Sequence, residues 1–79
     1  MRKSIHSEGL KAFSEVMAKA RADAGLTQQK LADRLKRPQS FVAKYEGGER
    51  RIDVVEFVTI ARAIGHDPVR LLKALLRRI

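Results

Sequence analysis

Glycine and proline divide this sequence into five stretches, and this division limits the fold more than any other feature. The breaks fall at Gly25, Pro38, Gly47–Gly48, Gly65 and Pro68. Between them, apolar residues recur every three or four positions, which is the period of a helix that packs on one face. No alternating pattern lasts long enough to indicate a strand. We therefore expect an all-α fold of five helices.

Capping residues refine the ends of these helices. Thr27 suits an N-cap, and Asp53 with Glu56 three residues later has the pattern of a capping box. Pro38 and Pro68 suit a first helical turn, where the missing N–H would have no partner. The expected helices run from about Ser7 to Ala24, from Gln28 to Leu35, from Pro38 to Gly47–Gly48, from after Asp53 to Gly65, and over residues 68–79, and residues 1–6 form a short N-terminal arm.

The charge of the chain indicates the kind of partner. The sequence has 79 residues, and 17 Lys and Arg against 9 Asp and Glu give a net charge of +8. A positive field of this size on one small domain, residues 1–79, favours nucleic acid or an anionic membrane. Cysteine is absent, so neither a disulfide nor a thiolate metal site can stabilise the fold.

Other classes of protein find little support. The start, MRKSIHSEGLK, has basic residues but no apolar run, and no segment approaches the roughly 18 apolar residues of a membrane span. We therefore expect a cytoplasmic protein without a membrane partner. His6 and His66 have no carboxylate or cysteine cluster at ligand spacing, and no catalytic grouping stands out. The sequence predicts neither an enzyme nor a metal or other cofactor.

The second and third helices have the proportions of a helix-turn-helix. Both are short, and about three residues, Lys36 to Pro38, join them. Ala32 supplies the small residue that two touching helices need. The apolar residues that face the rest of the domain are Leu31, Leu35, Val42 and Tyr45.

The outward face of the third helix then carries Gln39, Ser40, Ala43 and Lys44. Such short or amide-bearing side chains can enter a major groove without clashing. Gln can pair with adenine through two hydrogen bonds, and Lys can bond to guanine or to a phosphate. Phe41 has two interpretations, as an apolar contact to DNA or as a core residue.

The segments GLTQQKLADRL and PQSFVAKYEGGERRIDVVEFVTIARAIGHDP resemble the Cro/CI-type helix-turn-helix of the lambda-repressor-like, or XRE, family, over roughly Val16 to Leu72. The resemblance implies a five-helix lambda-repressor-like domain that binds double-stranded DNA. It implies contact with base edges for Gln39, Ser40 and Lys44. Ala43 lies on the same face, and it can offer only its methyl group to a thymine. It implies phosphate contacts for Gln28, Lys36, Arg37, Arg50 and Arg51, and a structural ion pair between Arg21 and Glu46.

This chain departs from the family pattern at the turn. Lys36 stands where the family usually has glycine, and a left-handed backbone there would cost a lysine about 1 kcal/mol. Arg37 stands where an apolar residue is usual. Both changes add positive charge at the corner between the two helices.

The C-terminal helix has a wide apolar side and four cations. We expect part of this side to form a two-fold homodimer interface through Leu72, Leu75, Leu76 and Ile79. The alternatives are that the whole apolar side packs on the domain, or that the helix lies on a membrane.

Together these features predict a sequence-specific transcriptional regulator of bacterial or phage type, most simply a repressor, that reads the major groove as a homodimer. One alternative is an antitoxin that neutralises a protein toxin and represses its own operon. Another is a basic protein that binds RNA or DNA of any sequence.

Overall fold

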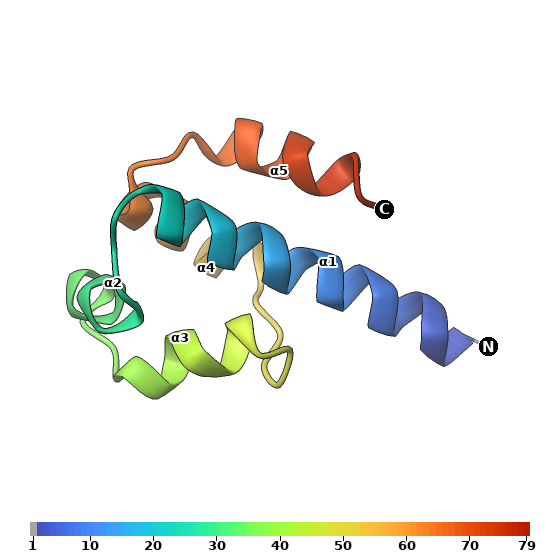
Figure 1. The fold of residues 1–79 in the computed structure, drawn as a ribbon, viewed down its shortest axis with the longest axis horizontal. Coiled ribbons are helices and arrows are strands. Elements are labelled where there is room, and N and C mark those ends of the chain that lie inside the picture. Colours follow the sequence, from blue (N-terminus) through green and yellow to red (C-terminus); the bar gives the residue numbers. More distant parts are fainter. Residues whose placement is uncertain (1) are drawn as a thin grey trace.

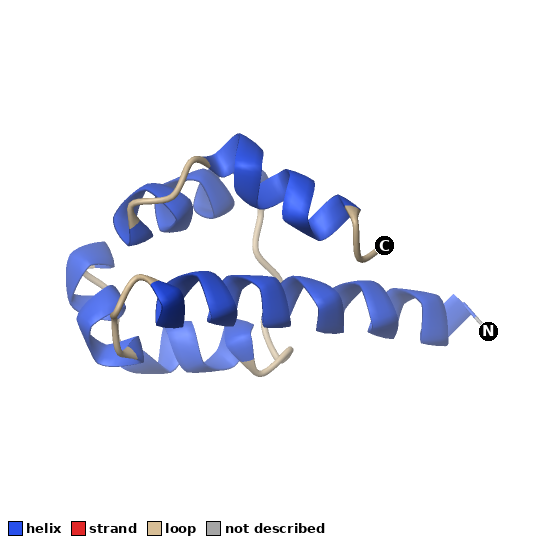
Figure 2. Ribbon diagram, turned by 45° about the horizontal axis from the view of Figure 1, so that its top comes forward, coloured by secondary structure: helices blue, strands red, loops and turns tan. Residues whose placement is uncertain are grey.

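The computed structural model describes residues 2–79, with side chains from residue 8 onward, and these residues form helices and no strand. The helices are α1 (Arg2–Asp23), α2 (Gln28–Leu35), α3 (Gln39–Glu46), α4 (Val54–Ile64) and α5 (Pro68–Leu76). The prediction of an all-α fold with five helices is therefore confirmed. Helix α1 lies across the middle of the molecule, between α3 and α5 (Figure 1). In the turned view, α4 and α5 lie on one side of α1 and α3 lies on the other (Figure 2).

The core forms where the five helices meet, and every helix contributes to it. The largest fully buried side chains are Met17, Leu31, Val42, Tyr45, Ile60 and Leu71. The rings of Phe13 and Phe57, 6.3 Å apart, extend the contact between α1 and α4. Each large apolar side chain buried in this way contributes about 1.5–3 kcal/mol. The core thus holds one face of α3 against the domain and leaves the other face in solvent.

Two helices end in the way that their glycines predict. At the end of α1, Gly25 has a φ of 77°, its N–H donates to the carbonyl of Ala22, and the N–H of Leu26 donates to the carbonyl of Arg21. This is the Schellman pattern, in which a left-handed glycine satisfies the last carbonyls. At the end of α4, Gly65 is also left-handed, with a φ of 90°.

Three helix ends differ from the prediction. Helix α1 already begins at Arg2 rather than at Ser7, because residues 2–6 include no glycine or proline to stop it. The expected arm is therefore helical from Arg2, and Met1 lies outside the described residues. Pro38 is the N-cap of α3 rather than its first residue, since its ψ of 151° is extended. Helix α5 ends at Leu76, so Ile79 lies beyond it; the last carbonyls of a helix have no intrahelical partner, and the end frays.

Hydrogen bonds from two arginine side chains connect helices at the surface of the domain. Arg78 donates to the carboxylate of Glu15, which joins the end of α5 to α1. Arg34 of α2 donates to the carbonyl of Ala63 near the end of α4, at 2.8 Å. Within residues 2–79, every helix is too short or too polar to cross a bilayer.

Candidate nucleic-acid interface

The corner between α2 and α3 is a tight turn with a left-handed backbone at Lys36. Its φ of 57° and ψ of 42° are those of the left-handed region, and its N–H donates to the carbonyl of Asp33. The N–H of Arg37 donates to the carbonyl of Ala32, and the side chain of Ala32 is fully buried. The turn therefore keeps the geometry that glycine would favour, with a strain of about 1 kcal/mol in the lysine backbone.

Helix α3 presents two different faces. Phe41, Val42 and Tyr45 are buried in the core. The four residues predicted to meet base edges lie on the other side: Gln39, Ser40 and Lys44 are exposed, and Ala43 is half-buried. Of the two interpretations of Phe41, the structure supports core packing, because its side chain is 7% exposed and packs edge-on against Tyr45.

A relay of hydrogen bonds runs from α1 through α3 and α2 to the exposed amide of Gln39. Arg21 donates to both carboxylate oxygens of Glu46, at 2.8 and 3.0 Å, and also to the carbonyl of Leu26. The amide of Gln28 donates to the same carboxylate at 2.9 Å. The amide of Gln39 donates to Gln28 Oε1 at 2.8 Å. Gln39 is thus held in place before any ligand arrives.

The electrostatics of this relay favour order. The side chains of Arg21 and Glu46 are 17% and 5% exposed, and the hydrogen bond from Arg21 to Glu46 raises the pKa of the guanidinium. A bidentate ion pair of this kind restricts both side chains more than a single hydrogen bond does. Gln39 Oε1 and its second amide N–H make no hydrogen bond with any described residue, so they can still bind a base edge.

Four side chains form a second cluster, the arginine–glutamate cluster, made of Arg37, Phe41, Arg50 and Glu56. The guanidinium of Arg37 lies 4.1 Å from the centre of the Phe41 ring, and that of Arg50 lies 4.8 Å from it. Both arginines also donate to the Glu56 carboxylate, at 3.2 Å. Hydrogen bonds from Arg50 and from the backbone N–H of Asp53 lower the pKa of Glu56. The cluster joins the turn, α3, the following loop and α4.

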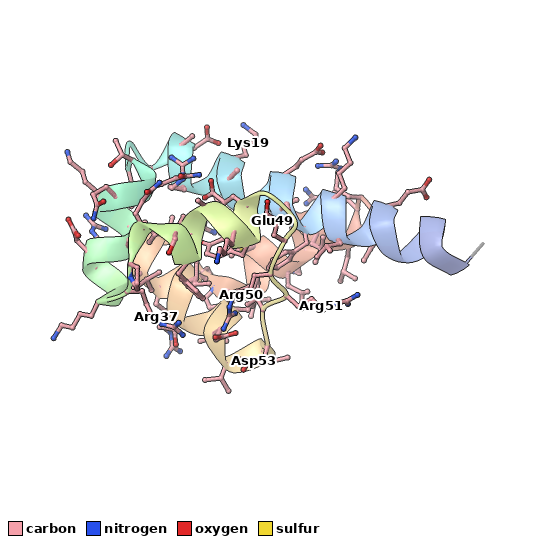
Figure 3. All side chains as sticks on the ribbon, turned by 90° about the horizontal axis from the view of Figure 1, so that it is seen from below. Lys19, Arg37, Glu49, Arg50, Arg51 and Asp53 are labelled. Carbon is pink, nitrogen blue, oxygen red and sulfur yellow. The ribbon has the colours of Figure 1, made fainter. Side chains whose placement is uncertain are left out.

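The cations predicted to meet phosphates lie around α3. Arg37, Arg50 and Arg51 lie on one side of it (Figure 3). Lys19 of α1, which was not among the predicted contacts, lies on the other side. Lys36 and Arg51 are exposed, and the carbonyl of Arg51 accepts a hydrogen bond from Arg50. Gln28 is different from these, because its side chain belongs to the relay. Its backbone N–H lies in the first turn of α2, where the N–H groups of a helix have no carbonyl of the same helix to bond to.

Helix α5 keeps much of its apolar side in solvent. Leu71 is its buried residue, whereas Leu72 and Leu76 are 44% and 60% exposed and Leu75 is half-buried. Ile79, beyond the end of the helix, is 68% exposed. A groove of about 210 Å³ runs beside Leu72 and Leu75. Its other lining residues are Phe13, Ile52, Asp53, Val54 and Phe57.

Sequence reasoning missed three of these features. Glu56 was interpreted only as a capping residue, although it also binds two arginines. The link between Gln28 and Gln39 joins residues 11 positions apart. The outward face of the third helix indicated Gln39, and only the resemblance to the family placed Gln28 near DNA. Ser14, which is buried in α1, donates to the carbonyl of Tyr45 at 2.9 Å and fixes the end of α3. A polar residue on the apolar face of α1 was the one available signal.

Comparison with known families and structures identifies this arrangement. A family described as "Helix-turn-helix domain" matches residues 12–75. A solved XRE-family like protein from Pseudomonas syringae pv. tomato is 49% identical, with a TM-score of 0.87 over 96% of this chain and 93% of the other. The chain belongs to the XRE-type helix-turn-helix family. Members of this family are DNA-binding regulators of transcription. The Cro/CI-type resemblance is thereby confirmed.

Other solved structures share the fold. The restriction–modification controller protein C.AhdI from Aeromonas hydrophila is 29% identical, with a TM-score of 0.72 over 78% of this chain and 94% of the other. The controller protein C.Esp1396I, solved as a tetramer in complex with its natural 35-base-pair operator, is 21% identical, with a TM-score of 0.81 over 89% of this chain and 92% of the other. No curated protein matches the chain.

Proposed function

We propose that this protein binds double-stranded DNA sequence-specifically through α3 and regulates transcription as a homodimer. The observation that carries the proposal is the exposed face of α3. It combines an amide held by an internal relay, Gln39, with a hydroxyl, Ser40, and a free cation, Lys44. A major groove about 12 Å wide admits one α-helix, and these side chains have the donors and acceptors that base edges require.

The cations around α3 support a second part of the proposal. Lys36, Arg37, Arg50 and Arg51 would bind phosphates on the strands that border the groove, and the first turn of α2 would offer the backbone N–H of Gln28 to another phosphate. Such contacts fix the register of a helix in the groove without reading sequence. They also make affinity fall steeply with salt.

The homodimer is supported by the apolar surface of α5. Leu72, which lines the groove described above, is exposed, as are Leu76 and Ile79 further along the chain, and exposed apolar surface of this kind marks an interaction site. Because α1 lies between α5 and α3, pairing through α5 would leave α3 free. A two-fold dimer would then place two α3 helices about 34 Å apart on a pseudo-palindromic operator.

Regulation by occupancy of a promoter, most simply repression, is the activity that we infer. An antitoxin would use the same fold and would additionally bind a protein toxin, so co-purification of a second protein would favour that reading.

Selection from random-sequence duplex DNA tests the proposal, followed by measurement of Kd for the winner and for a scrambled control near physiological salt. We expect an enriched inverted repeat that is bound at least about 10³-fold more tightly than the control. Equal binding to every sequence would reject a sequence-specific regulator and would leave a basic protein that binds nucleic acid of any sequence.

A further inference from the structure

The arginine–glutamate cluster places an anion among the cations that are proposed to bind DNA. Glu56 is 20% exposed, and its two partners, Arg37 and Arg50, are 42% and 38% exposed. Both guanidinium groups are therefore within reach of solvent and of a phosphate. Each of them also has N–H groups that Glu56 does not use, because guanidinium has five donors.

The geometry of the cluster is set from several sides. The Phe41 ring lies under both guanidinium groups, and contacts of a cation with an aromatic face favour this arrangement. The carboxylate of Glu56 joins the two arginines and also accepts the backbone N–H of Asp53 at 3.1 Å. Two positive charges and one negative charge leave the cluster with a net charge of one.

Glu56 changes how much the two arginines contribute to the affinity for DNA. A phosphate can bind the unused N–H groups, in which case it meets a cluster of net charge +1 because the carboxylate stays in place. Alternatively it displaces the carboxylate, which then attracts a cation from solution. Binding of DNA releases condensed cations, and an ion taken up by the protein reduces the net release. The cluster should therefore contribute about one ion to the salt dependence rather than two.

We propose that Glu56 is a specificity-determining residue that acts through Arg37 and Arg50. It lowers the part of DNA affinity that does not depend on sequence, and it holds both arginines in one orientation relative to α3. A specific complex, in which α3 has a fixed register, uses this orientation. A non-specific complex, which can slide along the backbone, responds mainly to charge. The inference rests on the proposed function, since it concerns the same surface.

The test is Glu56→Gln, with binding to a random-sequence duplex measured between about 50 and 200 mM salt. Gln at this position can still accept the N–H of Asp53, so the start of α4 is retained. We expect the plot of log K against log salt to become steeper by about 0.9, and affinity for the random duplex to rise about 5–10-fold at the lowest salt. Affinity for the selected site should rise less, so that the ratio of specific to non-specific affinity falls.

Glu15→Gln is the matched control, because Glu15 is also a carboxylate paired with one arginine, Arg78, but lies between α1 and α5. It changes net charge by the same amount and should leave both the slope and the ratio as in the wild type. An equal steepening in both variants would overturn the proposal, as would an unchanged slope in Glu56→Gln. The double variant Arg37→Gln/Glu56→Gln brings the net charge of the arginine–glutamate cluster back to +1. It should therefore return the slope of log K against log salt to the wild-type value.

Thermal unfolding of each variant checks that the domain is folded at the temperature of the assay. Should Glu56→Gln be unfolded there, Glu56→Asp is the second variant. It retains the charge and shifts its position, so the slope should stay unchanged while the ratio falls; an unchanged ratio would overturn the proposal. A wild-type protein that selects no site would reject the proposed function, whereas the slope on random DNA would still report the effect of Glu56.

Discussion

Gln39 differs from its neighbours on α3 because its side-chain amide is already bonded inside the protein. Ser40 and Lys44 make no side-chain hydrogen bond with any described residue, whereas Gln39 is the last member of a relay that begins at Arg21. A group that is held in its binding orientation loses less freedom when it binds. Gln39 should therefore contribute more discrimination between bases than an unrestrained glutamine would.

Replacing Gln39 with alanine tests this expectation. We expect affinity for the selected site to fall by about 1–3 kcal/mol, and affinity for random duplex to stay nearly constant, because a base contact is lost and no phosphate contact is. Fluorescence anisotropy with both duplexes measures the two values.

Gln29→Ala is the control for this change. Gln29 is exposed on α2 and donates to Asp33 of its own helix, so its removal should affect neither duplex. An equal loss on both duplexes in Gln39→Ala would show that Gln39 does not read bases.

Lys36 holds the strain of the turn. Glycine adopts this backbone conformation freely, and we expect Lys36→Gly to raise the free energy of unfolding by up to about 0.5 kcal/mol, because the greater freedom of glycine in the unfolded chain offsets part of the relief of strain. Urea denaturation measures the change. Lys36→Ala removes the same charge but keeps the strain, and should not stabilise the protein; a stabilisation as large as that of glycine would point to charge instead.

At the scale of elements, the start of α4 combines stability with the surface next to α3. Asp53 accepts the N–H of Glu56 at 2.7 Å, and Glu56 accepts the N–H of Asp53 at 3.1 Å, which completes the capping box. The sequence pattern predicted this box correctly. It could not predict the arginine partners, because Arg37 is 19 positions from Glu56 in the chain and reaches it only once α2, α3 and α4 have packed.

The lowered pKa of Glu56 makes this element sensitive to acid. A carboxyl group whose pKa is lower in the folded state than in the unfolded state stabilises the fold while it is ionised. This contribution is complete above the unfolded pKa of a glutamate, about 4.3, and is lost as the pH falls through the lower pKa of the folded state. Urea denaturation at several pH values should therefore show a weaker dependence on pH for Glu56→Gln than for the wild type.

Glu49→Gln is the control for the acid prediction, because Glu49 is exposed in the loop that precedes α4 and has no ion pair with a described residue. If the free energy of unfolding depended on pH in the same way for Glu56→Gln and for the wild type, the ion pairs of Glu56 would not contribute to stability.

For the whole molecule, the contact between two copies determines how it would lie on DNA. The exposed residues of α5 are expected to provide the contact, and Leu76→Glu should break it, because a buried unpaired carboxylate is costly at an apolar interface. Sedimentation velocity over a range of protein concentrations measures the change. Ala22→Glu places the same charge on the exposed end of α1 and should leave the dimer intact. A profile of Leu76→Glu that equals the wild type would remove α5 from the interface.

The sequence predicted the number and type of the helices well, because glycine, proline and capping residues act locally. The ends that it placed wrongly, at Ser7, Pro38 and Ile79, are those where no such residue decides or where proline suits two adjacent positions. For the candidate site, helical spacing indicated the outward face of α3, and the resemblance to the family indicated the cations and the glutamine of α2 that are expected to accompany it. The pairing of Gln28 with Gln39, and of two arginines with one glutamate, depends on packing between helices and needed the structure.

The relay also has a consequence for how such a regulator could acquire a new DNA target. Ser40 and Lys44 can change without disturbing the contacts between α2 and α3, whereas a new residue at Gln39 leaves Gln28 without its acceptor role and loosens the link to Glu46. Lineages of this protein that diverge in target should therefore vary first at positions 40 and 44, with positions 28 and 39 changing together. Libraries for retargeting would be built in the same order.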